Sequence, residues 1–227
     1  MPSSAVEPME TGPIQGVGPT LDALLRQPAR VIQELRVGEG GRLIRALLLV
    51  ALAGVIVYGL VVGSFSGGRQ LWAAPLKLSG GMLFSALICL PSLFIFSCLS
   101  GSRARLAQVA GLQCGLLALM TLLLLGFAPV AWVFSRSTES LVAMGALHLV
   151  FWVIALYFGL RFLNRGFVHM DERTGGGFKV WMVVFVLVML QMTTALRPIL
   201  GTSDTLLPEE KKFFLGHWFE VVQGNTR

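Results

Sequence analysis

The residues that could do chemistry in this 227-residue chain are few, and they lie within or beside long apolar runs. His148 is the only ionisable residue well inside such a run, and Gln113 is an amide inside an earlier one. Gln191, Thr194 and Arg197 stand together where the last run, VWMVVFVLVML, gives way to QMTTALRP. Polar groups at membrane depth are costly and mark functional sites by default. We call these five residues the candidate polar cluster.

Members of this cluster also have a structural explanation. A lone histidine on an apolar helix is usually packed and hydrogen-bonded, and His148 has no acidic or second histidine partner in its own run. Threonine hydroxyls bond back to their own helix, and a terminal arginine reaches the interface. We expect the Gln191 amide to face the other helices and to bond toward Gln113 or Thr121. Helix packing is a sufficient explanation, and a polar substrate site near Gln191 is the alternative.

No motif for catalysis or metal binding is present in full. The chain has no HExxH, and GSFSG places Phe65 where the nucleophile of a GxSxG motif would be. RTGGGFK lacks the Gly-Lys-Ser/Thr ending of a phosphate-binding loop. HMDER at 169–173 is a weak cation site, for which a solvated loop is the preferred interpretation. The sequence therefore predicts no catalytic residue, no cofactor, no metal site and no enzymatic activity.

The composition is typical of a membrane protein. Hydrophobic residues make up 55% of the chain and charged residues 13%, with a mean hydropathy of +0.74. Soluble domains are about 45–50% apolar and about 25% charged. Three cysteines without a CxxC spacing are interpreted as small apolar residues. The net charge of +6 does not indicate nucleic-acid binding, because the basic residues are scattered between the apolar runs.

Five apolar runs reach the length of about 20 residues that a helix needs to cross the hydrocarbon core. Within a domain over 41–200, the runs are 43–64, 79–99, 106–130, 141–163 and 178–197. Pro91 in the second run should kink its helix without ending it. The sequence therefore predicts an all-α, polytopic transmembrane helical bundle with five spans.

The basic residues indicate an orientation. With the N-terminus inside, eleven of the 18 lysines and arginines fall in inner segments and seven, Lys77 among them, in outer ones. Membrane proteins carry an excess of basic residues on the cytoplasmic side. The expected topology is an N-terminus in the cytoplasm and a C-terminus outside.

An amphipathic segment precedes the first span. After a tail over 1–19 that is predicted to be disordered, residues 20–40 combine apolar positions at helical spacing with Arg26, Arg30 and Arg36. Pro28 suits the first turn of a helix because its missing N–H is not needed there. We expect a helix that either lies in the inner membrane interface or packs on the protein's own cytoplasmic face.

A second amphipathic segment, 201–227, follows the last span. Its aromatic residues Phe213, Phe214 and Trp218 suit the membrane–water boundary. Together with the three arginines of the first segment, they form the candidate membrane and partner surface.

Small residues recur at four-residue spacing within the third run, at Ala107, Gly111 and Gly115. Such rows let helix backbones approach closely where no hydrophobic force drives association. A compact monomeric bundle is the preferred interpretation, and a homo-oligomer formed through this face is the alternative.

The order of these features resembles the bacterial branch of the Yip family of five-span membrane proteins. The likeness rests on LLRQPARVIQELR before the first span, on LWAAPLKLSGG entering the second, and on five runs joined by short loops. It covers 20–197, and the extension over 198–227 departs from it. Eukaryotic relatives are associated with Rab-type GTPases and vesicle membranes. The resemblance implies a non-enzymatic protein, here of a bacterial inner membrane, that organises membrane or recruits partners.

The leading hypothesis is therefore a membrane-organising or scaffold subunit in contact with the lipid bilayer and with protein partners. The alternative is a small transporter or channel with a polar path near Gln113, His148, Gln191 and Thr194. Against it stand the missing intramembrane carboxylates and an odd number of spans, which cannot be divided into inverted repeats.

Overall fold

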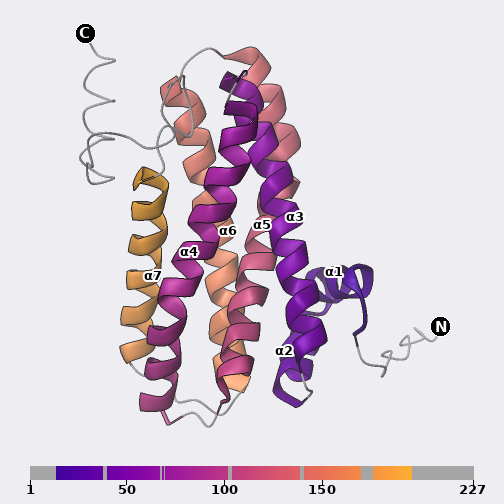
Figure 1. The fold of residues 1–227 in the computed structure, drawn as a ribbon, viewed down its shortest axis with the longest axis vertical. Helices are drawn as coiled ribbons and strands as arrows, with labels where there is room; N and C mark the ends of the chain where they lie inside the picture. The colour runs from indigo at the N-terminus through magenta and orange to yellow at the C-terminus, as the bar shows by residue number, and fades with distance from the viewer. Residues whose placement is uncertain are drawn as a thin grey trace, which may run out of the picture.

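Helices are the regular secondary structure of the described residues, and turns and short connections join them. The computed structural model describes residues 14–37, 40–66, 68, 70–101, 104–138, 141–169 and 176–195. Its seven helices are α1 (Val17–Arg26), α2 (Pro28–Val37), α3 (Gly41–Ser66), α4 (Gln70–Leu99), α5 (Leu106–Ser137), α6 (Leu141–His169) and α7 (Gly176–Ala195). Helices α3 to α6 stand side by side, α7 lies next to α4, and α1 and α2 lie against the lower part of the bundle (Figure 1). The prediction of an all-α bundle is confirmed.

Four of the five predicted spans are long apolar helices. The spanning parts of α3 to α6 are Gly41–Phe65, Leu71–Leu99, Leu106–Ser137 and Ala143–His169. Helix α7 stands where the fifth span was predicted, but its apolar part, Phe178–Met192, is shorter. Helices α4, α5 and α6 run past the predicted ends of their apolar runs.

Helix α4 begins nine residues before its predicted start at 79, so residues 70–78, which were assigned to the preceding loop, belong to the helix. Pro75 lies inside it, and Lys77 is only 5% exposed. The interpretation of Lys77 as an outer-loop residue is therefore wrong. Pro91 also lies within α4, and the helix continues past it as predicted.

Helix α5 is central to the packing. It contacts α3 and α6 along their lengths, α3 also packs on α4, and α7 packs on α4. Helices α3 and α4 approach closely at Gly59 of α3, where an added Cβ would lie 2.5 Å from the Cα of Pro75. Short connections between α3, α4, α5 and α6 make successive helices antiparallel neighbours.

The amphipathic segment forms two helices and not one. Gln27, between α1 and α2, has φ −136° and ψ 60°, because the ring of Pro28 disfavours the helical conformation for the residue before it. The helix over PARVIQEL begins at Pro28 as the sequence indicates.

The predicted disordered tail, 1–19, overlaps residues that the structure describes as ordered. Within the expected disordered segment 1–19, Ile14 is buried and α1 begins at Val17. Residues 1–13 and the aromatic segment 201–227 lie outside the described residues.

Candidate functional site

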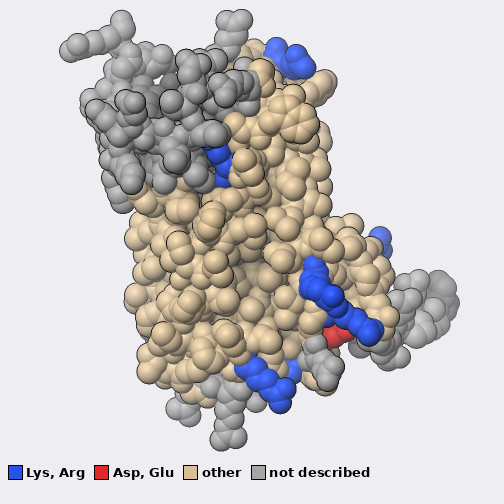
Figure 2. Space-filling model, viewed as in Figure 1, with Lys and Arg blue, Asp and Glu red and all other residues tan. Residues whose placement is uncertain are grey.

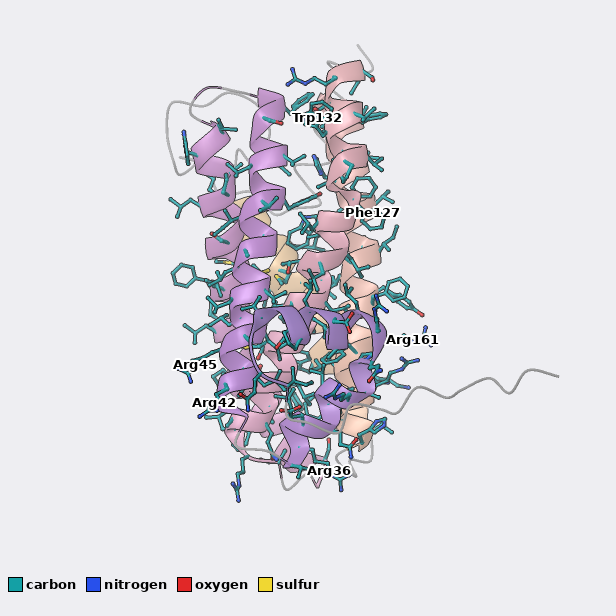
Figure 3. All side chains as sticks on the ribbon, turned by 90° about the vertical axis from the view of Figure 1, so that its right-hand side faces the viewer. Arg36, Arg42, Arg45, Phe127, Trp132 and Arg161 are labelled. Carbon is teal, nitrogen blue, oxygen red and sulfur yellow. The ribbon has the colours of Figure 1, made fainter. Side chains whose placement is uncertain are left out.

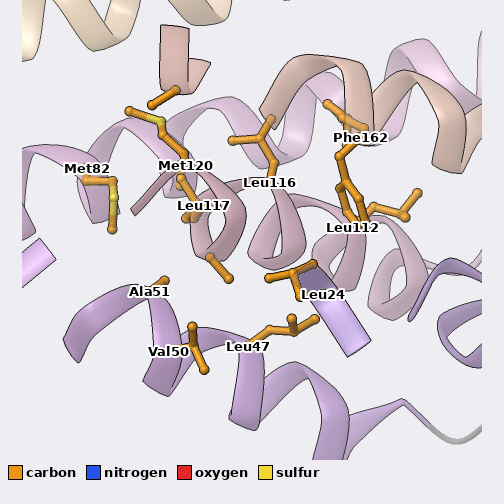
Figure 4. Packing of buried hydrophobic residues seen from close by; sticks show 14 of the residues in the cluster. Leu24, Leu47, Val50, Ala51, Met82, Leu112, Leu116, Leu117, Met120 and Phe162 are labelled. Carbon is orange, nitrogen blue, oxygen red and sulfur yellow. The ribbon is translucent and has the colours of Figure 1, made fainter. Parts of the chain in front are cut away.

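The apolar faces of α1 and α2 belong to the core of the bundle. Leu24, Ile32 and Leu35 are each 1% exposed. Leu24 lies near Leu47 of α3 in the packed layer drawn in Figure 4. The sequence left open whether this segment lies in the membrane interface or packs on the protein itself. The buried apolar faces of α1 and α2 pack on the protein itself.

Hydrogen bonds join α2 to α5 and to the segment that precedes α1. The Gln108 side chain donates to the carbonyl of Arg36 at 2.7 Å and accepts from the N–H of Arg105 at 2.8 Å, which joins α2 to the start of α5. The Glu34 carboxylate accepts the N–H of Ile14 at 2.9 and 3.0 Å. Helices α1 and α2 are thus a fixed part of the bundle.

Basic side chains gather at the end of the bundle that carries α1 and α2. Figure 3 shows Arg36, Arg42, Arg45 and Arg161 in this lower part, and Figure 2 shows the blue of lysines and arginines around it. We define the basic end by the lysines and arginines that the structure describes there: Arg26, Arg30, Arg36, Arg42, Arg45, Arg105, Arg161, Arg165 and Lys179.

Few acidic groups offset this charge. Asp22 and Glu34 are the only acidic residues in the described part of the chain. Asp22 pairs with Arg26 at 2.7 Å, and Glu34 is occupied by the backbone of Ile14. At the opposite end, Arg136 stacks over the ring of Trp132 at 5.5 Å. The basic end is therefore the electropositive end of the described molecule.

A hydrogen bond inside the bundle joins α3 to α6. Tyr58 Oη and His148 Nδ1 are 2.6 Å apart, and both side chains are buried. The interpretation of His148 as a packed, hydrogen-bonded residue is confirmed. Its partner, Tyr58, was missed, although a lone tyrosine in the run VIVYGLVVG is the kind of residue whose buried hydroxyl needs a partner.

The geometry of this pair favours one tautomer. Nε2 of His148 has no hydrogen-bond partner among the described residues. If Tyr58 donates to Nδ1, only the Nε2–H is left unpaired; if Nδ1–H donates, both the tyrosine hydrogen and the Nε2 lone pair are left. Each unmade bond in apolar surroundings costs about 1–3 kcal/mol. Of the two neutral tautomers, the one with the proton on Nε2 and with Tyr58 donating to Nδ1 therefore leaves fewer groups unpaired.

The amides of the candidate polar cluster do not meet as predicted. Gln113 donates from Nε2 to the carbonyl of Ala86 at 2.8 Å, and Thr121 bonds to the carbonyl of Ala118 in its own helix. Gln191 is exposed on α7, which packs against α4. The prediction that Gln191 faces the bundle to bond Gln113 or Thr121 is therefore wrong.

The structure also separates Gln113 from His148. Phe151, one turn after His148, stacks on Phe127 of α5 with ring centroids 4.6 Å apart. Gln113 precedes Phe127 by 14 residues of α5, about 20 Å at a rise of ~1.5 Å per residue. Four buried apolar residues, Leu116, Leu117, Met120 and Leu124, lie in this interval, together with buried Thr121, whose hydroxyl donates within its own helix. Thr194 and Arg197 lie outside the side chains that the structure describes.

Two of the small residues on α5, Gly111 and Gly115, pack against other helices of the same chain. A Cβ on Gly111 would lie 2.6 Å from the side chain of Leu35, and one on Gly115 would lie 2.5 Å from the ring of Phe162. The compact bundle is therefore the correct interpretation of Gly111 and Gly115, and these two glycines offer no face for a second copy. Ala107 is exposed.

Metal-binding geometry is not found in the described residues, which contain no group of three His, Cys, Asp or Glu side chains placed to hold an ion. Of the HMDER segment, His169 ends α6 with Nδ1 2.8 Å from the carbonyl of Arg165. The rest of that segment lies outside the described residues.

Four long apolar helices around a packed interior make this chain a multi-pass helical membrane protein. Comparison with known proteins finds no matching family model, no matching curated protein and no matching solved structure.

Proposed function

We propose that this protein is a non-enzymatic scaffold of the membrane, whose basic end recruits partners of negative charge. The observation that carries the proposal is that Arg26 and Arg36 are held on helices packed against the bundle. Both are exposed on helices whose apolar faces are packed into the bundle. Side chains held on a fixed support lose less conformational freedom on binding than those of a mobile tail. The partners are anionic lipid headgroups or acidic protein surfaces.

Five spans and a cytoplasmic N-terminus are part of the same proposal. Helix α7 has 20 residues, about the number needed to cross the hydrocarbon core. The concentration of arginine at the basic end supports its placement on the cytoplasmic side of a bacterial inner membrane. This arrangement agrees with the resemblance to the Yip family, which remains part of the proposal.

The test replaces Arg26, Arg30 and Arg36 by glutamine in the full chain, reconstituted in nanodiscs of phosphatidylethanolamine and phosphatidylglycerol. We expect the glutamine variant to retain several-fold less cytosolic protein and several-fold less phosphatidylglycerol than the unmodified protein. Its thermal stability should be unchanged. The matched control replaces the same three residues by lysine, which keeps the charge and should keep most of the retention. Retention equal to that of the unmodified protein in the glutamine variant would contradict the proposal.

A further inference from the structure

Helix α1 presents three distinct sectors around its axis. Thr20, Ala23 and Leu24 are buried against the bundle. Val17, Leu21 and Leu25 are 47%, 36% and 55% exposed. At about 100° per residue, these three lie within about 80° of one another, beside the buried sector. Asp22 and Arg26 occupy the remaining arc as an exposed ion pair.

This exposed apolar stripe of Val17, Leu21 and Leu25 lies between the buried sector and the polar arc of α1, and the described residues leave it uncovered. The face of α1 that packs on the bundle is formed by Thr20, Ala23 and Leu24. The stripe is therefore not needed for that packing. An amphipathic helix that lies in a membrane interface has such a combination of a polar arc and an uncovered apolar arc. For a helix surrounded by water, an uncovered apolar arc would not be stabilising.

The position of α1 along the bundle axis indicates which part of the membrane lies beside the stripe. Leu24 packs in the layer of Leu47, which is six residues, or about 9 Å, from the start of α3 at ~1.5 Å per residue. The spanning segments have 25 to 32 residues, so they are about 38–48 Å long against ~30 Å of hydrocarbon. About 4–9 Å at each end then extends into the headgroups. Helix α1, which crosses the side of α3 above its lower end (Figure 1), lies at the edge of the hydrocarbon.

We propose that α1 is immersed in the leaflet at the basic end, with Val17, Leu21 and Leu25 in contact with lipid acyl chains. The Asp22–Arg26 pair lies at the headgroup level. Because α1 is fastened to α3, its immersion fixes the depth at which the bundle sits and the level at which the basic end meets the membrane surface. The inference requires the four long spanning helices and goes beyond the proposed recruiting function, since it holds for either orientation.

The test measures the environment of spin labels on the full chain in nanodiscs of phosphatidylethanolamine and phosphatidylglycerol. Cys89, Cys98 and Cys114 are replaced by alanine, and single cysteines are introduced at Leu25 and, as the matched position on the polar arc, at Asp22. Collision with oxygen reports the hydrocarbon and collision with a water-soluble nickel chelate reports the aqueous phase. Labels at Leu49, 55% exposed on α3, and at Gln33, exposed on α2, serve as references.

We expect the label at Leu25 to match Leu49, with high oxygen and low nickel accessibility, and the label at Asp22 to shift toward Gln33. Nickel accessibility at Leu25 equal to that at Gln33 would overturn the inference, because the stripe would then face water. Low accessibility to both reagents would also overturn it, because protein would then cover the stripe. An immersed Leu25 with unchanged partner retention in the arginine variants would contradict the proposed function alone.

Discussion

Tyr58 and His148 form a buried polar contact between two helices of the bundle. Their 2.6 Å hydrogen bond joins α3 to α6, two helices that each pack mainly on α5. The ring of His148 also meets Tyr58 and Phe151 edge to face, at centroid distances of 5.6 and 6.4 Å. The bond therefore fixes the rotation of α6 relative to α3, which apolar contacts alone specify weakly.

Replacing Tyr58 by phenylalanine should destabilise the bundle, because both nitrogens of His148 would then lack partners. Interhelical hydrogen bonds in membranes average about 0.6 kcal/mol and reach about 1.7 kcal/mol, and burial places this one toward the upper value. Reversible unfolding in mixed micelles measures the change. The control is Tyr157→Phe, at a tyrosine 59% exposed on α6. Equal stabilities of the two variants would refute a structural role for the bond.

At the scale of the elements, close approach of backbones decides which helices are neighbours. Gly59 of α3 leaves room for the Pro75 backbone of α4, and Trp181 of α7 donates to Ser92 Oγ of α4 at 3.1 Å, beside Pro91. Both contacts lie next to prolines of α4. The first joins α4 to α3, and the second joins α4 to α7.

Gly59→Ala should cost about 1–3 kcal/mol of stability, the usual cost of overpacking, because the new methyl group would meet backbone and not a flexible side chain. Gly80→Ala on α4 is the matched control, since nothing lies within 4 Å of its Cβ position. There the loss of glycine flexibility should stabilise the helix by about 0.5–1 kcal/mol. Opposite signs are expected in the same unfolding assay, and a neutral Gly59→Ala would show that α3 and α4 are not in contact at this point.

At the scale of the whole molecule, the placement of charge and of polar groups bears on function. The arginines of the basic end lie at one end of the described bundle, whereas Gln113 and His148 are separated by buried leucines and a methionine. A transporter or channel needs a continuous polar path, and these two residues do not form one.

Topology is tested with single cysteines at 38, 102, 138, 174 and 204 on a cysteine-free background in intact cells. With five spans and a cytoplasmic basic end, an impermeant reagent should label only positions 138 and 204. Labelling at 38 or 174 would place the basic end outside and would remove the basis for recruitment of cytoplasmic partners. Labelling at 138 but not at 204 would indicate four spans.

The sequence by itself determined the class of the protein and the approximate positions of its four long apolar helices. Runs of apolar residues at membrane length locate α3 to α6, because backbone groups in hydrocarbon must be satisfied within the segment. Pro28 locates the start of α2 for a reason equally local, its missing N–H. The basic character of the segment before the first span also followed from composition alone.

Only the tertiary structure decided which faces meet. In a soluble helix the polar side faces water, but in a membrane the buried and lipid-facing sides are both apolar, so periodicity does not tell them apart. The partner of His148 is 90 residues away in the sequence, and that of Gln113 is 27 residues away. Gln191 is exposed, whereas Gly111 and Gly115 are internal, because neighbouring helices and not local pattern set those environments.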